Sequence, residues 1–272
     1  MRILEVCDNA LFEVGYLAAS PERRMVSATM AVQRVLVDRL PGGLQAVFVT
    51  SDLQGRTYAA DGSARLLGLA LAEDLATFCA ATRVDAEATA VLLGGDLFAL
   101  TDLTRRGGLG DVRDVWRSFS AHFGFMAGVA GNHDDFGGSS SSLEAFCAEP
   151  RIHFLDGGMV ELGVAGTGPG LRVSGVSGVI GNPLKPWRRA EEDYLAAVAG
   201  ALALAPDILV LHQNPALPDT RRRDAQRLAE LLAKDATCLV AFGHSACTRA
   251  VVDWGRAQLL ATDHRAFWLE GV

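Results

Sequence analysis

The sequence lacks the features that mark membrane and secreted proteins. No apolar run among its 272 residues approaches the roughly 20 residues that a membrane-spanning helix needs. Residues 1–8 do not resemble a secretory signal peptide, because their apolar stretch is too short and acidic residues follow it at once. The five cysteines are scattered and form no C-x-x-C pair, as is typical of thiols kept reduced inside the cell. We therefore expect a cytoplasmic protein that has no membrane partner.

The sequence is also poor in positive charge. Its 25 Lys and Arg residues face 32 Asp and Glu residues, so the formal net charge is -7. The three arginines at 221–223 form its one short basic run. This balance disfavours broad nucleic-acid binding through a basic face, although it leaves room for a local anion site. Half of the residues are hydrophobic (50%), which predicts a globular core.

Short apolar runs alternate with amphipathic stretches along the chain. We expect strands at 46–50, 90–94, 125–129, 170–176, 207–211, 238–242 and 258–262. We expect helices at 22–40, 64–82, 112–123, 189–204 and 219–234. This alternation predicts an α/β fold with covered sheets. Successive short strand-like runs at 152–176 add part of a second sheet, which indicates a layered sandwich.

The same pattern predicts one domain across residues 1–272. Residues 1–45 are expected to form a strand plus a helix that pack on this domain as an extension. Two stretches rich in glycine or serine, 104–110 and 137–142, are expected to be loops.

Potential metal ligands follow directly after five of the apolar runs. The first run is followed by Asp52 and Gln54, the second by Asp96, and the third by a Gly-Asn-His-Asp string. His212 and His244 follow the fourth and fifth runs. Ligands of α/β sheets gather beyond the carboxyl ends of strands, so these side chains are expected to converge.

The residue types indicate a particular chemistry. The aspartates, the Asn132 amide and the two strand-end histidines form a mixed oxygen and nitrogen set, which suits Mn²⁺, Fe²⁺ or Zn²⁺. His133 remains available for acid–base work. Two divalent ions roughly 3.5–4 Å apart can bind the oxygens of a phosphoryl group and activate a water molecule.

These motifs, in this order, resemble those of the calcineurin-like metallophosphoesterases. That family's pattern is D-x-H, G-D, G-N-H-[DE], a strand-end H and G-H-x-H, and the match runs from Asp52 to Ala246. The resemblance implies the family's metallo-dependent phosphatase-like fold, a four-layer α/β/β/α sandwich. Residues 1–8 also resemble a strand that ends in an aspartate, Asp8, but they lack the glycine that follows Gln54, so we prefer Asp52.

The resemblance also implies a role for each matched residue. Asp96 would bridge two metal ions, and Asp52 would belong to one of the two metal sites. His133 would protonate the leaving oxygen or stabilise the transition state. Three residues would complete the other site: Asn132, His212 and His244.

Two positions depart from the family pattern. Gln54 and Ala246 occupy the places of two histidines that belong to the same metal site. That site keeps Asp52, the shared Asp96 and the Gln54 carbonyl oxygen. We therefore expect one tight site and one weak site, with Mn²⁺ as the favoured ion and Fe²⁺ or Zn²⁺ as alternatives. Cys247 lies one residue past the gap and is expected to turn away from it.

The resemblance implies a metal-dependent phosphoric ester hydrolase. It would act as a phosphomonoesterase or phosphodiesterase on a phosphorylated small molecule or nucleotide, by metal-activated water. Arg56 is the first candidate for binding the phosphate, and further candidates are Arg105, Arg106, Arg188 and Arg189. The alternative is a catalytically weak relative that binds a phosphorylated ligand or has a regulatory role. The sequence leaves the oligomeric state open.

Overall fold

The computed structural model describes residues 1–59, 61–218, 220 and 225–272, and it has a mixed α/β fold. Its described strands form two main sheets and two short pairs. In spatial order, the larger sheet contains β10 (Ile152–Phe154), β8 (Phe125–Gly128), β6 (Thr89–Leu93), β3 (Ala46–Thr50), β19 (Ala266–Gly271), β2 (Met25–Val37), β1 (Ile3–Ala19), β4 (Arg56–Tyr58) and β5 (Ala64–Leu66).

The smaller sheet has six described strands. In order these are β11 (Met159–Leu162), β12 (Leu171–Val176), β15 (Ile208–Leu211), β16 (Leu239–Phe242), β18 (Ala257–Ala261) and β17 (Val251–Trp254). The short pairs join β7 (Gly110–Asp111) to β9 (Asp134–Asp135), and β13 (Val179–Ile180) to β14 (Arg188–Arg189). The helices are α1 (Leu67–Thr82), η1 (Ala86–Ala88), α2 (Arg113–His122), α3 (Ser140–Cys147), α4 (Glu191–Ala203) and α5 (Gln226–Asp235).

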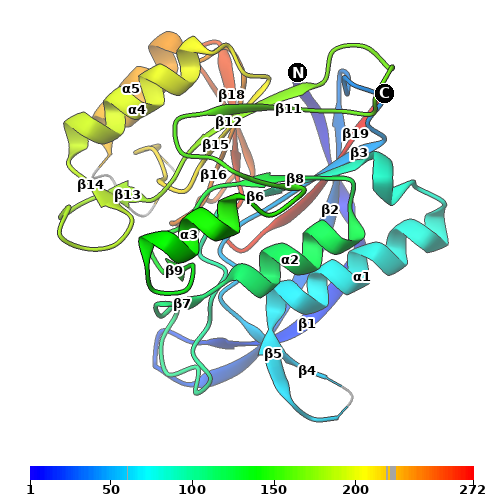
Figure 1. Ribbon diagram of the computed structural model, residues 1–272, viewed down its shortest axis with the longest axis vertical. Coiled ribbons are helices and arrows are strands. Elements are labelled where there is room, and N and C mark those ends of the chain that lie inside the picture. The colour runs from blue at the N-terminus through cyan, green and yellow to red at the C-terminus, as the bar shows by residue number, and fades with distance from the viewer. Residues whose placement is uncertain (60, 219, 221–224) are drawn as a thin grey trace.

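Buried apolar side chains form three clusters, one inside and two outside the pair of sheets. Val47 of β3 and Val210 of β15 belong to the inner cluster, which joins the two sheets. Phe48 points to the other face of β3, because side chains alternate along a strand, and packs in a cluster with residues of α1 and α2. The third cluster joins α4 and α5 to the smaller sheet. Figure 1 shows α1 and α2 on the opposite side of the molecule from α4 and α5.

The strands predicted from apolar runs are present, with ends that differ by at most one residue. β3 has the predicted bounds, and all five of its residues are buried, as are those of β6. Parallel pairing of β3 with β6 and of β6 with β8 explains the continuous apolar runs, because strands covered on both faces need no polar alternation. Residues 104–109 form a loop, as predicted, and the short strand β7 begins at Gly110.

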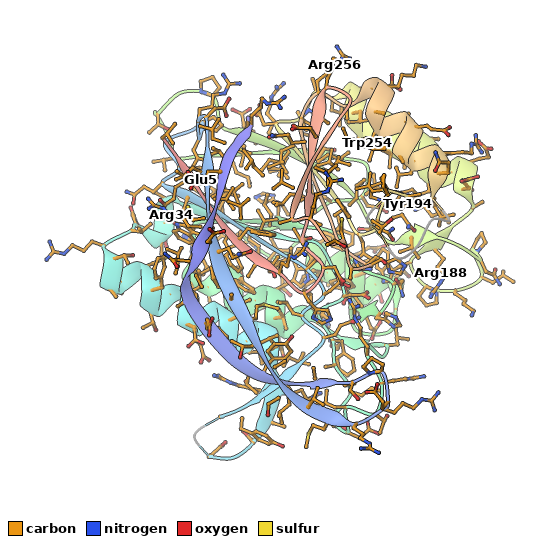
Figure 2. All side chains as sticks on the ribbon, turned by 180° about the vertical axis from the view of Figure 1, so that it is seen from behind. Glu5, Arg34, Arg188, Tyr194, Trp254 and Arg256 are labelled. Atoms are coloured by element: carbon orange, nitrogen blue, oxygen red, sulfur yellow. The ribbon has the colours of Figure 1, made fainter. Side chains whose placement is uncertain are left out.

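The helix predicted at 22–40 is wrong, because these residues form a turn and strand β2. Strands β1 and β2 make a long antiparallel hairpin, which Figure 2 shows as two ribbons crossing the molecule. β2 is rich in β-branched residues, which favour strands. It also pairs in parallel with β19, so residues 1–45 build part of the larger sheet.

Two further segments differ from prediction or lie partly outside the described residues. The serine run was expected to be a loop, but it begins α3, whose N-cap Ser139 accepts a hydrogen bond from the main-chain N–H of Ser142. Of the helix predicted at 219–234, residues 219 and 221–224 lie outside the described residues, and α5 begins at Gln226. The arginine run at 221–223 lies outside them too. No helix within the described residues is long and apolar enough to cross a membrane.

Candidate metal centre

Loops from both sheets bring the predicted ligands to one place. Asp96 follows β6 of the larger sheet, whereas His212 and His244 follow β15 and β16 of the smaller sheet. One potential ligand atom from each of these three residues lies within 4.8 Å of the other two. Residues far apart in the sequence therefore form a cluster that could hold a divalent ion.

His212 is oriented by a main-chain carbonyl. Its Nδ1 lies 2.8 Å from the carbonyl oxygen of Gly94, which can only accept, so Nδ1 carries the hydrogen. The lone pair of Nε2 is then directed toward the cluster, where Nε2 lies 3.4 Å from Asp96 Oδ1. Nε2 is buried and has no hydrogen-bond partner among the described residues. A metal-ligating histidine commonly has this arrangement, with the second ring nitrogen bonded to a carbonyl.

Asn132 and His133 follow β8 and complete this side of the centre. The Asn132 Oδ1 atom is buried, and it too has no hydrogen-bond partner among the described residues. An amide oxygen in that state is costly unless a cation binds it. The main-chain N–H of His133 donates to Asp96 Oδ1 at 2.9 Å. The donor atoms of Asp96, His212 and His244 suit a divalent ion, and the buried Asn132 Oδ1 offers a further oxygen ligand.

Asp134 stabilises the two loops that carry Asp96 and Asn132, although no separate role was predicted for it. Its buried carboxylate accepts from the main-chain N–H groups of Asp96 and Leu97, both at 2.8 Å, and of Gly131 at 2.7 Å. These bonds join the loop after β6 to the loop after β8. The acidic fourth position of the G-N-H-[DE] motif was the signal that could have indicated this role.

The main chain is strained where the loops turn into the centre. Asp52, Asp96 and His244 have φ values of 55°, 57° and 69°, a region that costs a non-glycine residue about 1–3 kcal/mol. Gly95 and Gly131 make the close approach of two loops possible. A Cβ on Gly95 would lie 2.2 Å from Gly131 N, and a Cβ on Gly131 would lie 2.1 Å from Asp96 Oδ1.

The predicted ligands of the second site lie beside the first but are hydrogen-bonded to other groups. Gln54 Nε2 donates to Asp96 Oδ2 at 2.8 Å, while Gln54 Oε1 accepts from Arg106 Nε at 2.7 Å. Arg106 Nη2 also lies 3.1 Å from Asp52 Oδ1. Ala246 lines the same cavity, which measures about 260 Å³. In this arrangement Gln54 and Asp52 do not fit a second divalent ion.

The concentration of buried charge shifts several pKa values. Burial raises the pKa of Asp52 to about 8, and the Asp263 carboxylate adds to this rise, whereas His212 and Arg106 oppose it. Burial also disfavours the Asp96 carboxylate, but without a bound ion His212 is protonated, its pKa being raised to about 10 chiefly by the Asp96 charge against burial, and this positive charge together with the main-chain N–H of His133 holds the pKa of Asp96 below its usual range. The Asp96 carboxylate therefore carries buried negative charge that favours a bound cation.

His133 lies at the edge of the same cavity. Burial lowers the pKa of its imidazole, and the charges of Arg188 and Arg105 lower it further, while Asp96 opposes them. Arg105 and Arg188, together with Lys185, line a neighbouring cavity of about 290 Å³ that also reaches His133. Figure 2 labels Arg188, which lies on the same side of the molecule as Tyr194 of α4. This neighbouring cavity, which we call the basic cavity, could receive an anionic part of a ligand.

Three other residues considered from the sequence lie away from the metal cluster. The Arg56 guanidinium donates to the main-chain carbonyls of Ala99 and Leu100 at 2.8–3.1 Å, so these contacts hold the loop after β6 and give no support to phosphate binding. Cys247 packs in the apolar cluster beneath α4 and α5. Asp8 is exposed in the middle of β1.

Comparisons with known proteins support the fold. The sequence matches no protein-family model and no curated protein. The crystal structure of TT1561 of Thermus thermophilus has a TM-score of 0.56 at 17% identity, and the match covers 81% of this chain and 90% of that one. Phosphopantetheinyl hydrolase (PptH) from Mycobacterium tuberculosis matches over 82% of this chain and 90% of its own, at 13% identity and a TM-score of 0.47, too low to establish a common fold. The likeness to TT1561 shows a shared fold and says nothing of activity.

Proposed function

We propose that this protein is a metal-dependent phosphoric ester hydrolase of the calcineurin-like type, with the four-layer α/β/β/α arrangement of that family. The convergence of Asp96, His212 and His244 within 4.8 Å is the observation that carries the proposal. It was expected from motifs that are 116 and 32 positions apart in the chain, counting from 96 to 212 and from 212 to 244. Chance rarely brings such strand-end residues to one point.

The chain's own residues have complementary roles in this proposal. Asp96, Asn132, His212 and His244 would hold the ion, with Mn²⁺ favoured and Fe²⁺ or Zn²⁺ as alternatives. A bound divalent ion supplies Lewis-acid stabilisation of phosphoryl oxygens and lowers the pKa of water. The His133 imidazole lines the cavity, where it can donate a proton to the leaving oxygen of the ester.

The substrate class is proposed from the charges around the centre. The basic cavity lies beside His133, so it suits the part of a phosphorylated small molecule or nucleotide that lies beyond the phosphoryl group. Both monoesters and diesters fit this description. The scattered cysteines, with no C-x-x-C pair, suit a cytoplasmic location for the reaction.

A second candidate function is binding of a phosphorylated ligand without turnover, in a regulatory protein. The hydrogen bond from Gln54 to Asp96 favours it, because the family's imidazole at that position has been replaced by a donor amide. This candidate shares the metal cluster and the basic cavity with the enzyme. It differs only in the absence of a chemical step.

Hydrolysis of 4-nitrophenyl phosphate and bis(4-nitrophenyl) phosphate separates the two candidates. Chelator-treated protein should regain activity with Mn²⁺, and the activity should be lost in Asp96→Ala together with the bound ion. His133→Ala should keep the ion but lose about 10²–10⁴-fold in kcat. Binding of Mn²⁺ and inorganic phosphate without turnover by any divalent ion would instead support the regulatory protein.

A further inference from the structure

Arg106 joins three loops on the side of the centre where the second metal site was expected. It belongs to the glycine-rich loop after β6. Its Nη2 contacts Asp52 Oδ1 after β3 and Asp263 Oδ1 after β18, and its Nε donates to Gln54 Oε1. One guanidinium thus contacts two carboxylates and an amide oxygen, which are the kinds of oxygen atom that bind a hard cation.

The second carboxylate oxygen of Asp52 and that of Asp96 are also hydrogen-bonded. Asp52 Oδ2 accepts from Ser51 Oγ at 2.7 Å and from the main-chain N–H of His244 at 2.9 Å. Asp96 Oδ2 accepts from Gln54 Nε2 at 2.8 Å. A second ion would have to break several of these bonds. It would also have to approach a fixed positive charge.

The two carboxylates that contact Arg106 need a positive charge close to them. The Asp52 and Asp263 side chains are 1% and 3% exposed, and buried carboxylates are stable only when a cation or hydrogen-bond donors compensate them. The Arg106 side chain is 40% exposed, so one part of it compensates the aspartates while another faces the cavity. Its Nη1 has no hydrogen-bond partner among the described residues.

We infer that the Arg106 guanidinium takes the place of the second metal ion, so that the centre combines one divalent ion with one fixed organic cation. Gln54 and Ala246, where the sequence departs from the two-metal pattern, are then part of this replacement. Gln54 orients the guanidinium, and Ala246 leaves room beside it. The Nη1 group is left to donate to a phosphoryl oxygen. This inference rests on the proposed function for its metal ion, but its claim about Arg106 can fail separately.

Metal stoichiometry tests the inference without using activity. Protein saturated with Mn²⁺ and then dialysed is analysed for bound metal by inductively coupled plasma mass spectrometry. Metal-free protein is titrated with Mn²⁺ alone in a calorimeter. The wild type should hold one ion per chain, and Arg106→Ala should gain a second, weaker one. The triple variant Arg106→Ala, Gln54→His and Ala246→His should hold two ions more tightly. Arg106→Lys should stay at one, because the positive charge is kept.

Arg105→Ala is the matched control, since it removes the neighbouring arginine of the same loop and should leave the stoichiometry at one. Two tightly held ions in the wild type would overturn the inference while leaving the proposed function intact. A folded Arg106→Ala protein that still binds one ion would also overturn it. No ion in the wild type would overturn the proposed function and this inference with it. Two tightly held ions in the wild type would overturn the inference even where Arg106→Ala fails to fold, and Arg106→Lys then tests the requirement for the positive charge.

Discussion

Asp134 and Asp96 form a buried pair in which one carboxylate positions the other. Asp134 Oδ2 accepts from the main-chain N–H of Asp96 at 2.8 Å, and the Asp96 side chain lies in the metal cluster. Asp96 has a left-handed main chain, with φ at 57°. The bond from Asp134 helps to stabilise this otherwise unfavourable turn, which directs the Asp96 carboxylate toward His212.

We predict that Asp134→Ala lowers the free energy of unfolding by about 3–5 kcal/mol. The change leaves three buried main-chain N–H groups, those of Asp96, Leu97 and Gly131, without their acceptor. Urea unfolding measures the loss. Asp135→Ala is the control, because the Asp135 side chain accepts from the main-chain N–H of Gly138 in an exposed turn. Equal losses in the two variants would show that Asp134 has no special structural role.

A second prediction concerns His212. Its replacement by alanine removes a buried ligand atom, so the affinity for Mn²⁺ should fall by more than the roughly 10–100-fold that loss of an outer partner causes. Calorimetric titration with Mn²⁺ measures this change. His153→Ala, at an exposed position on β10, should bind Mn²⁺ like the wild type. Unchanged affinity in His212→Ala would remove His212 from the metal centre.

The sequence predicted the strands that position the centre but not the hairpin of β1 and β2. The run at 46–50 is apolar and β-branched, and strands of this kind are recognisable locally. β1 instead spans 17 residues with mixed burial, so its alternation is broken by register shifts. The place of β2 in the sheet depends on pairing with β19 at the other end of the chain, a contact that no local pattern contains.

Part of the candidate site was also predictable from the sequence, namely the residues that follow strands. Residues at strand ends converge because parallel strands end on one edge of a sheet, and this rule places His212 beside His244, after the parallel strands β15 and β16. Their meeting with Asp96, which follows a strand of the other sheet, depends on how the two sheets pack. The role of Arg106 was not predictable, because the path of an irregular loop has no periodicity. Arg105 and Arg106 are equivalent in the sequence and both line the basic cavity, yet it is Arg106 that contacts Asp52.

A third prediction tests the basic cavity. Arg188→Ala should raise KM about fivefold for a phosphate ester whose leaving group carries a negatively charged substituent, a change equivalent to ~1 kcal/mol. It should leave KM for 4-nitrophenyl phosphate unchanged, because the leaving group of that ester has no charged substituent for the cation to attract. Steady-state kinetics with both esters gives the comparison. Lys234→Ala, an exposed change on α5, is the control, and an equal KM rise for both esters would argue against the cavity.

The last prediction concerns the stability of the protein at low pH. The pKa of His264 is lowered to about 4, chiefly by burial and further by the charge of Arg106, while Asp263 and Asp96 oppose the shift. The usual pKa of histidine is 6.5. Between these two values the unfolded chain takes up a proton that the folded protein does not, so stability present above pH 6.5 is lost as the pH falls toward 4.

From pH 7 to pH 5 this linkage should lower the free energy of unfolding by about 2 kcal/mol. Other groups also titrate in this range, so the loss is isolated by comparing urea unfolding of the wild type with His264→Gln at both pH values. The variant should lose about 2 kcal/mol less than the wild type, because glutamine takes up no proton. His122→Gln, an exposed change on α2, should show the wild-type loss. The same loss in His264→Gln as in the wild type would mean that His264 titrates equally in the folded and unfolded chains.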